Sequence, residues 1–94
     1  MKIPEKVKIG GIVYDIKFQQ LPCENDHNVD GQIIYDKQEI RIKPGKPENY
    51  EAVLFLHEVI HGIFDYCCLK QDERQVDLLA KVLYQVIKDN DLQF

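Results

Sequence analysis

Three side chains suited to metal and acid–base chemistry stand together at residues 57–61. His57 and His61 are four positions apart, and Glu58 directly follows the first histidine. On a helix, residues four apart share a face about one turn from each other, so both imidazoles can reach the same metal ion. Glu58 would then lie beside the open side of that ion, where a carboxylate can take a proton from water. If the segment is helical, the spacing predicts a hydrolytic metal site.

The surrounding residues predict that helix. The segment from Asn49 to Phe64 contains no proline, and its single glycine comes late. Apolar residues recur in it at helical spacing and form a wide stripe that includes the histidine face: Val53, Leu54, Leu56, Ile60 and Phe64. Two histidines and a glutamate are costly to bury without a partner, and a bound cation would supply one. The alternative is a pair of partly exposed histidines on an amphipathic helix that binds no metal.

A second helix is predicted after the first, and it offers a further ligand. A zinc site needs a third protein ligand so that its fourth position can take water. The segment from Gln71 to Lys88 has Asp72 as a suitable N-cap and apolar residues at helical spacing. Glu73, in its first turn, can point a carboxylate at the metal. Asp77, one turn later, can accept a hydrogen bond from the far ring nitrogen of a ligand histidine and fix its tautomer.

The pattern H-E-x-x-H followed by a helix with E-x-x-x-D resembles the gluzincins, the thermolysin-like group of zinc metallopeptidases. In that group the glutamate is the third ligand and the aspartate orients a histidine, roles that the resemblance assigns to Glu73 and Asp77. The run from Glu73 to Leu83 is also similar to the E-x-x-A-x-x-F-A-x-x-L pattern of the ImmA/IrrE-type metallopeptidases. Over residues 31–90 the chain looks like small phage-type zincin proteins.

The link between the two helices departs from the family pattern. Only eleven residues separate His61 from Glu73, fewer than in thermolysin-like enzymes. A tight turn between Cys67 and Lys70 would have to fold the second helix straight back, which is ordinary for a helix hairpin. The short link leaves Asp77 and Asp65 open as alternative third ligands.

The resemblance implies zinc-dependent hydrolysis of peptide bonds. Zinc would be held by His57, His61 and Glu73, and Glu58 would act as the general base that passes a proton to the leaving amine. Zincin enzymes commonly add a tyrosine or histidine that stabilises the oxyanion, and the sequence leaves four candidates: His27, Tyr35, Tyr50 and Tyr66. One alternative is a latent or inactive zincin-like binding module of phage or mobile-element origin. Another is a structural site closed by a fourth protein ligand.

Short strands are predicted ahead of the helices. Two apolar runs around Gly10-Gly11 alternate as in a β-hairpin, and residues 32–35 and 39–43 predict a second hairpin turned around Asp36-Lys37. The expected fold is therefore α+β. It consists of a small antiparallel sheet of three to four strands followed by a two-helix hairpin, in one minimal zincin-like domain over residues 1–94.

One of these strands is a candidate for substrate binding. In zincin-type folds an edge strand runs above the active-site helix, and an extended peptide can pair with it. The resemblance points to the strand from Glu39 to Lys43, in which polar and apolar side chains alternate: Glu39, Ile40, Arg41, Ile42 and Lys43. Polar side chains also protect ordinary edge strands from pairing. The same pattern is therefore equally expected of an edge strand that binds nothing.

Charge and composition restrict the partners and the location. The net charge is −4 and Lys and Arg do not cluster, which argues against a nucleic-acid surface. No apolar stretch reaches the length of a membrane span, and the first residues lack the apolar core of a signal peptide. Three cysteines without framework spacing predict no disulfide scaffold, and Cys67 and Cys68 are expected to be buried. These features predict a cytoplasmic protein, and the resemblance to the zinc metallopeptidases implies a peptide or protein substrate.

Overall fold

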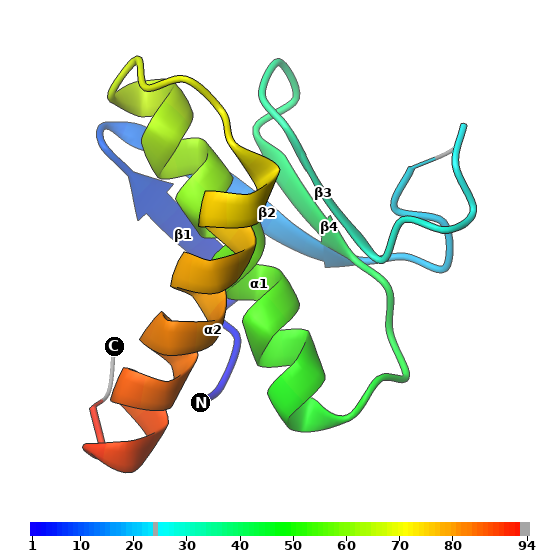
Figure 1. The fold of residues 1–94 in the computed structure, drawn as a ribbon. Coiled ribbons are helices and arrows are strands. Elements are labelled where there is room, and N and C mark those ends of the chain that lie inside the picture. The colour runs from blue at the N-terminus through cyan, green and yellow to red at the C-terminus, as the bar shows by residue number, and fades with distance from the viewer. Residues whose placement is uncertain (24, 93–94) are drawn as a thin grey trace.

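A computed structural model describes residues 1–23 and 25–92 of the chain. A four-stranded sheet forms one layer, and two helices follow it in the sequence (Figure 1). The strands are β1 (Lys6–Ile9), β2 (Ile12–Phe18), β3 (Gly31–Ile34) and β4 (Glu39–Ile42), and the helices are α1 (Glu48–Tyr66) and α2 (Glu73–Asp89). This arrangement confirms the α+β class expected from the sequence.

The strand order in the sheet is β1-β2-β4-β3. Both hairpins are antiparallel, as expected: β1 pairs with β2 across the two-glycine turn, and β3 pairs with β4 across a turn at residues 35–38. The central pair differs, because β2 and β4 run parallel, with Ile16 opposite Ile40. After β2 the chain crosses to the far edge of the sheet, where it forms β3. The second hairpin, β3 and β4, therefore pairs with β2 through β4. The sheet is therefore mixed.

The expectation that the strand from Glu39 to Lys43 lies at an edge of the sheet is wrong. β4 lies between β2 and β3, and its two isoleucines are fully buried. Its alternating polar residues lie on the face away from these isoleucines, where Glu39 forms ion pairs with Lys17 and Arg41 at 2.7 and 2.9 Å. Alternation reports which face of a sheet a side chain is on, not whether the strand is at an edge. The two edge strands are β1 and β3.

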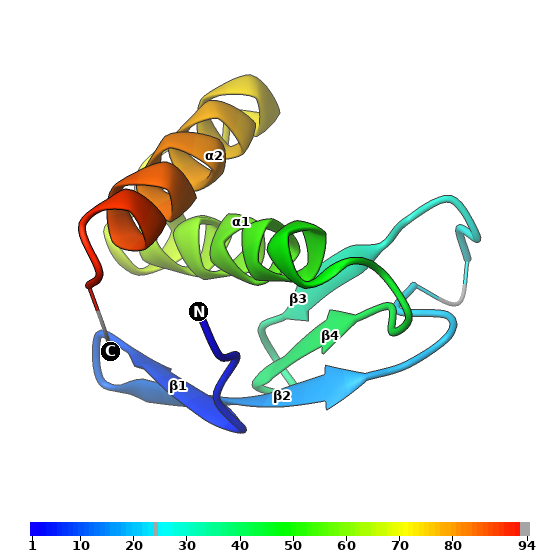
Figure 2. The ribbon, with the colours of Figure 1, turned by 90° about the horizontal axis from the view of Figure 1, so that it is seen from below.

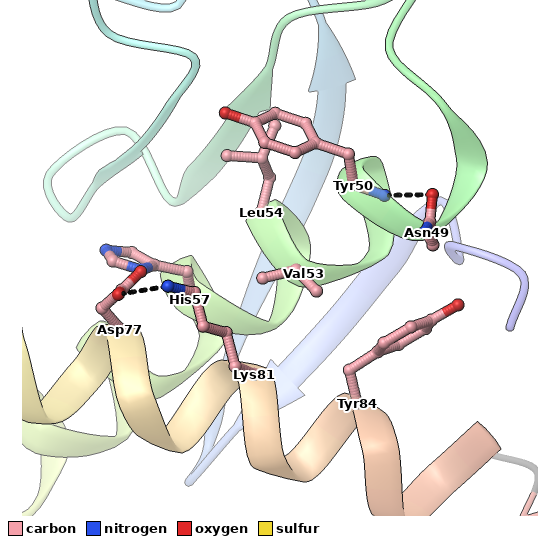
Figure 3. Close-up of a pocket in the computed structure, with 8 residues that line it drawn as sticks. All are labelled: Asn49, Tyr50, Val53, Leu54, His57, Asp77, Lys81 and Tyr84. Carbon is pink, nitrogen blue, oxygen red and sulfur yellow. Dashed lines mark hydrogen bonds and ion pairs between the residues drawn. The ribbon is translucent and has the colours of Figure 1, made fainter. Parts of the chain in front are cut away.

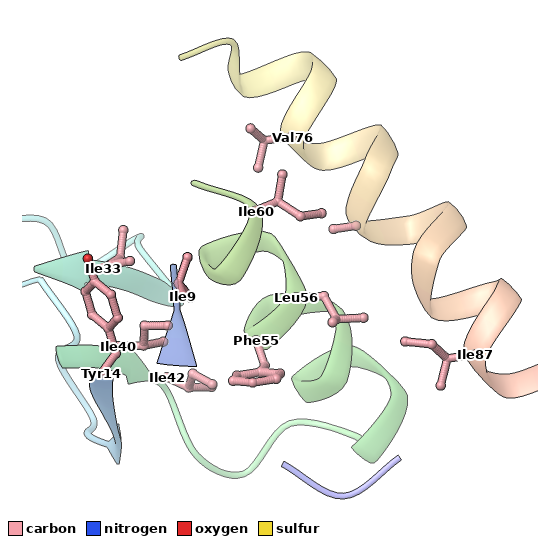
Figure 4. Close-up of a cluster of buried hydrophobic side chains, with 11 residues drawn as sticks. Ile9, Tyr14, Ile33, Ile40, Ile42, Phe55, Leu56, Ile60, Val76 and Ile87 are labelled. Carbon is pink, nitrogen blue, oxygen red and sulfur yellow. The ribbon is translucent and has the colours of Figure 1, made fainter. Parts of the chain in front are cut away.

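Helix α1 lies between the sheet and α2, as Figure 2 shows. The buried core includes the contact of α1 with the sheet and its contact with α2 (Figure 4). Phe55 points toward the sheet near Ile42, whereas Leu56 and Ile60 point toward α2. Helix α2 contributes three buried residues from one face: Val76, Ala80 and Ile87. Because α1 is covered on two sides, its apolar stripe has to be wide, which agrees with the sequence pattern.

The ends of the helices define the short link that the candidate site depends on. Helix α1 ends at Tyr66, and the chain then turns, with Cys68 at a φ of 56°. Asp72 is the N-cap of α2, as the sequence predicts, because its side chain accepts a hydrogen bond from the backbone N–H of Gln75 at 3.1 Å. This cap starts α2 at Glu73 and places that residue in the first turn.

Two further expectations concern the surface of the molecule. Cys67 and Cys68 were expected to be buried, and this is wrong, since both are exposed and free beyond the end of α1. Cys23 is partly buried and also free. Within residues 1–23 and 25–92, neither helix has the combination of length and apolar character that a membrane span requires.

The turn between β1 and β2 packs directly against the end of α1. Gly10 has a φ of +61°, which glycine adopts without strain, and a Cβ added to it would overlap the ring of Tyr66. Gly10→Ala should therefore lower the free energy of unfolding by about 2 kcal/mol, through backbone strain and displacement of the ring. Urea unfolding measures this effect. Gly11→Ala is the matched control, because within residues 1–23 and 25–92 no atom beyond Gly11 and its two chain neighbours lies within 4 Å of the added Cβ. Equal stability of the two variants would contradict this packing.

Candidate metal centre

The two histidines of α1 face the same space beside the start of α2. His57 and His61 are one helical turn apart, and their rings meet edge to face with centroids 4.8 Å apart. Their Nε2 atoms are 3.2 Å apart, and each side chain is only 15% exposed. The two nitrogens thus converge, as the four-residue spacing predicts.

Glu73, the first residue of α2, completes this group. Its Oε1 lies 2.6 Å from Nε2 of His57, and its Oε2 lies 3.0 Å from Nε2 of His61. One ligand atom from each of the three residues lies within 4.8 Å of the others. Tetrahedral zinc with bonds of about 2.0–2.1 Å spaces its ligand atoms by about 3.3 Å, so a small opening of the group would admit the ion. A metal ion at this place would bind the three ligand atoms in their unprotonated forms.

Neither alternative third ligand joins this group. Asp77 lies one turn further along α2, with Oδ1 3.9 Å from Nδ1 of His57, the ring nitrogen that points away from the group. The hydrogen bond from Lys81 at 2.9 Å is the main reason that the pKa of Asp77 is lowered. Asp65 is exposed on α1 and lies outside the group. The place of Asp77, on the far side of the ring, suits a residue that orients His57.

Among the described residues, Glu58 is the one charged side chain that is buried, with 6% of its surface exposed. Its pKa is raised to about 7, mainly because burial disfavours the charged carboxylate. The negative charge of Glu73 adds to this rise, whereas the charge of His61 and a hydrogen bond with the backbone of Ile33 act in the opposite direction. A carboxyl group with a pKa near neutrality can both take and give a proton at neutral pH, as general acid–base chemistry requires.

The strand that borders these residues is β3, an edge strand of the sheet. A Cβ added to Gly31 would lie 3.3 Å from Oε2 of Glu58, so the absence of a side chain keeps this place open. A cleft of about 610 Å³ lies between β3, α1 and the start of α2. It is lined by all four residues of the H-E-x-x-H and Glu73 pattern: His57, Glu58, His61 and Glu73.

Two of the four candidate oxyanion donors line this cleft. Tyr50, in the first turn of α1, donates a hydrogen bond from its hydroxyl to Asp30 at 2.9 Å. Tyr35 follows β3, and burial is the main cause that raises its pKa to about 12. His27 and Tyr66 are both exposed, and neither lines the cleft. Of the four candidates, Tyr35 and Tyr50 are thus the two that line the cleft.

A second groove continues from the cleft between α1 and α2 (Figure 3). Its volume is about 520 Å³, and it shares four lining residues with the cleft: Tyr50, Leu54, His57 and Asp77. Its apolar and aromatic lining comes from both helices: Tyr50, Val53, Leu54 and Tyr84. The ammonium of Lys81 at one side is paired with Asp77 at 2.9 Å, which offsets its charge. The groove therefore offers an apolar surface beside the candidate metal centre.

Comparison of the chain with protein-family models, with curated proteins and with solved structures finds no match in any of the three. The resemblance to the gluzincins and to the ImmA/IrrE-type metallopeptidases thus rests on the residues of the two motifs and remains a prediction. The geometry of the side chains is a separate observation, and it carries the functional argument.

The sequence did not single out two residues that take part in the site. Gln71 precedes α2, and its Oε1 lies 2.7 Å from Nδ1 of His61. Gly31 borders Glu58 from the edge strand. Neither residue belongs to a motif, because the place of Gln71 depends on how the link folds back and that of Gly31 on which strand is at the edge. The one available signal is a long polar side chain in a short link next to the candidate ligand Glu73.

Proposed function

We propose that this protein is a zinc-dependent metallopeptidase of the cytoplasm that hydrolyses peptide bonds. The observation that carries the proposal is the convergence of two imidazole nitrogens and one carboxylate, with the buried carboxyl group of Glu58 beside them. Two histidines and a glutamate with a fourth position left for water are a known donor set of catalytic zinc. The three free cysteines support a reducing compartment.

In this mechanism five residues that line the cleft have assigned roles. His57, His61 and Glu73 hold the zinc, which when bound supplies a Lewis acid that polarises a carbonyl and acidifies water. Glu58 takes a proton from the attacking water and delivers it to the leaving amine, and its raised pKa suits both steps near neutral pH. Asp77 orients the ring of His57 from its Nδ1 side.

The free edge of β3 is the surface that we assign to the substrate backbone. One side of β3 pairs with β4 and the other borders the cleft, so an extended peptide can add to the sheet as a further strand. Gly31 leaves space for that backbone beside Glu58. The apolar groove between α1 and α2 can take a large apolar side chain of the bound peptide.

Zinc binding by ligand variants tests this proposal directly. We expect one zinc per chain in the wild type, measured by metal analysis and by competition with a chromophoric chelator. Glu73→Ala should weaken zinc binding more than about 100-fold because it removes a charged ligand, and Asp77→Ala about 10-fold because it removes an orienting partner. Glu48→Ala, at the exposed start of α1, is the control. Full zinc with unchanged affinity in both cleft variants would refute the ligand set.

A further inference from the structure

Gln71 makes a two-point contact with His61 from the link between the helices. Its Oε1 lies 2.7 Å from Nδ1 of His61, and its Nε2 donates a hydrogen bond to the backbone carbonyl of the same residue at 2.9 Å. The hydroxyl of Tyr35 lies 3.5 Å from the same amide nitrogen. One amide side chain thus bridges the ring and the backbone of a single histidine.

This bridge fixes where the proton of the neutral imidazole lies. An amide nitrogen can only donate, and the carbonyl of His61 can only accept, so the amide nitrogen of Gln71 faces the carbonyl and its oxygen faces the ring. An amide oxygen can only accept, and Nδ1 of His61 must therefore carry the proton. Nε2 is left with its lone pair, directed at Nε2 of His57 and at Glu73.

We propose that Gln71 is a positioning residue that selects the Nδ1–H tautomer of His61 and so presents Nε2 as a metal ligand. The metal half of this statement rests on the proposed function, whereas the tautomer half concerns the protein alone. The opposite tautomer would place a proton on Nε2, in the space that a metal would take. Imidazole ligands are commonly held in this way through their second nitrogen.

The two histidines are thus oriented by groups of different charge. His57 has the carboxylate of Asp77 on its Nδ1 side, at 3.9 Å, and His61 has a neutral amide at 2.7 Å. The centre already contains the carboxyl groups of Glu58 and Glu73. A neutral partner for His61 fixes its tautomer without adding a further negative charge.

Three variants distinguish the selection of the His61 tautomer from a purely structural role, in which Gln71 only fixes the link between α1 and α2. Gln71→Leu removes both hydrogen bonds at similar length, and Gln71→Ala removes them without adding a larger apolar group. Gln71→Glu keeps an acceptor for Nδ1–H but loses the donor to the backbone. Gln75→Leu, also an exposed glutamine replaced near the start of α2, is the matched control.

Two measurements decide the question. The first uses long-range ¹H–¹⁵N correlation on chelator-treated protein, at a pH where both imidazoles are neutral. We expect the Nδ1–H form of His61 in wild type, Gln75→Leu and Gln71→Glu, and a shift toward the Nε2–H form in Gln71→Leu and Gln71→Ala. The second is zinc affinity by chelator competition, which should fall about 10- to 100-fold in Gln71→Leu and Gln71→Ala. It should stay near the wild-type value in Gln75→Leu.

Each result supports or overturns the assignment. A wild-type tautomer in Gln71→Leu and Gln71→Ala, or the Nε2–H form in the wild type, would overturn it. A tautomer shift with unchanged zinc affinity would overturn the metal half. A wild type that binds no zinc would refute the proposed function, while the tautomer measurement would still decide the role of Gln71. If Gln71→Leu does not fold, Gln71→Ala and Gln71→Glu give the same comparison.

Discussion

Replacing Glu58 with glutamine should abolish peptide cleavage while zinc remains bound at one ion per chain. Glutamine has nearly the same shape as glutamate but cannot take a proton from water, so the step assigned to the carboxyl group is lost. General acid–base catalysis contributes about 10²- to 10⁴-fold, and we expect kcat/KM to fall at least that far. Cleavage of a peptide library, followed by mass spectrometry, measures the loss, and metal analysis of the same samples measures the zinc.

Glu48→Gln is the matched control for this experiment, because it makes the same chemical change at the exposed start of the same helix. It should cleave as the wild type does. Unchanged cleavage by Glu58→Gln would show that the assigned mechanism is wrong. A wild type that binds zinc fully and cleaves no library peptide would instead favour the binding module. In that case the three-residue centre would be retained without turnover.

Local signals in the sequence predicted the elements of this fold, whereas the pairing of the central strands needed the structure. The two-glycine turn, the alternating apolar runs and the Asp72 cap each act within a few residues, and each feature is present. The parallel pair of β2 and β4 depends on where the chain lies after residues 19–30. Hairpin signals do not contain that information, and the resemblance to zincin-type folds pointed to β4 as the edge strand, a place that β3 occupies.

In the candidate site, too, some features could be predicted from the sequence and others required the structure. The convergence of His57, His61 and Glu73 follows from helical periodicity and from an N-cap, which are readable in the sequence. The amide of Gln71 on His61 and the open place beside Gly31 arise from how the link and the edge strand lie in space. Sequence motifs thus identify the residues that could bind a metal. The structure identifies the residues that orient those ligands or lie beside them.

The protein without metal should become less stable as the pH rises from about 4.5 to about 7, because of Glu58. Its pKa is about 7 in the folded state and 4.5 in its ordinary state. A group whose pKa is raised by folding stabilises the folded state fully below the ordinary pKa, and this contribution is lost as the pH rises through the folded pKa. At about 1.4 kcal/mol per pKa unit, the loss is on the order of 3–4 kcal/mol.

Urea unfolding in the presence of a chelator, repeated across this pH range, measures that loss. Glu58→Gln has no charge to bury, so it should lack this part of the pH dependence and be more stable than the wild type near neutral pH. The difference between the two curves isolates Glu58 from other titrating groups, and Glu48→Gln should follow the wild type. Parallel curves for wild type and Glu58→Gln would contradict the prediction.

Peptide cleavage and urea unfolding of Glu58→Gln together distinguish a general base from a residue that is buried only for packing. If Glu58 served only for packing, its replacement would lower the stability of the protein. Activity would then fall only because the protein unfolds. We expect a different result, because Glu58→Gln should remove cleavage and at the same time raise the stability of the metal-free protein. Zinc added to the wild type at neutral pH should raise stability by binding only the folded state. A buried charge that destabilises the free protein and is needed for turnover is the pattern expected of a general base.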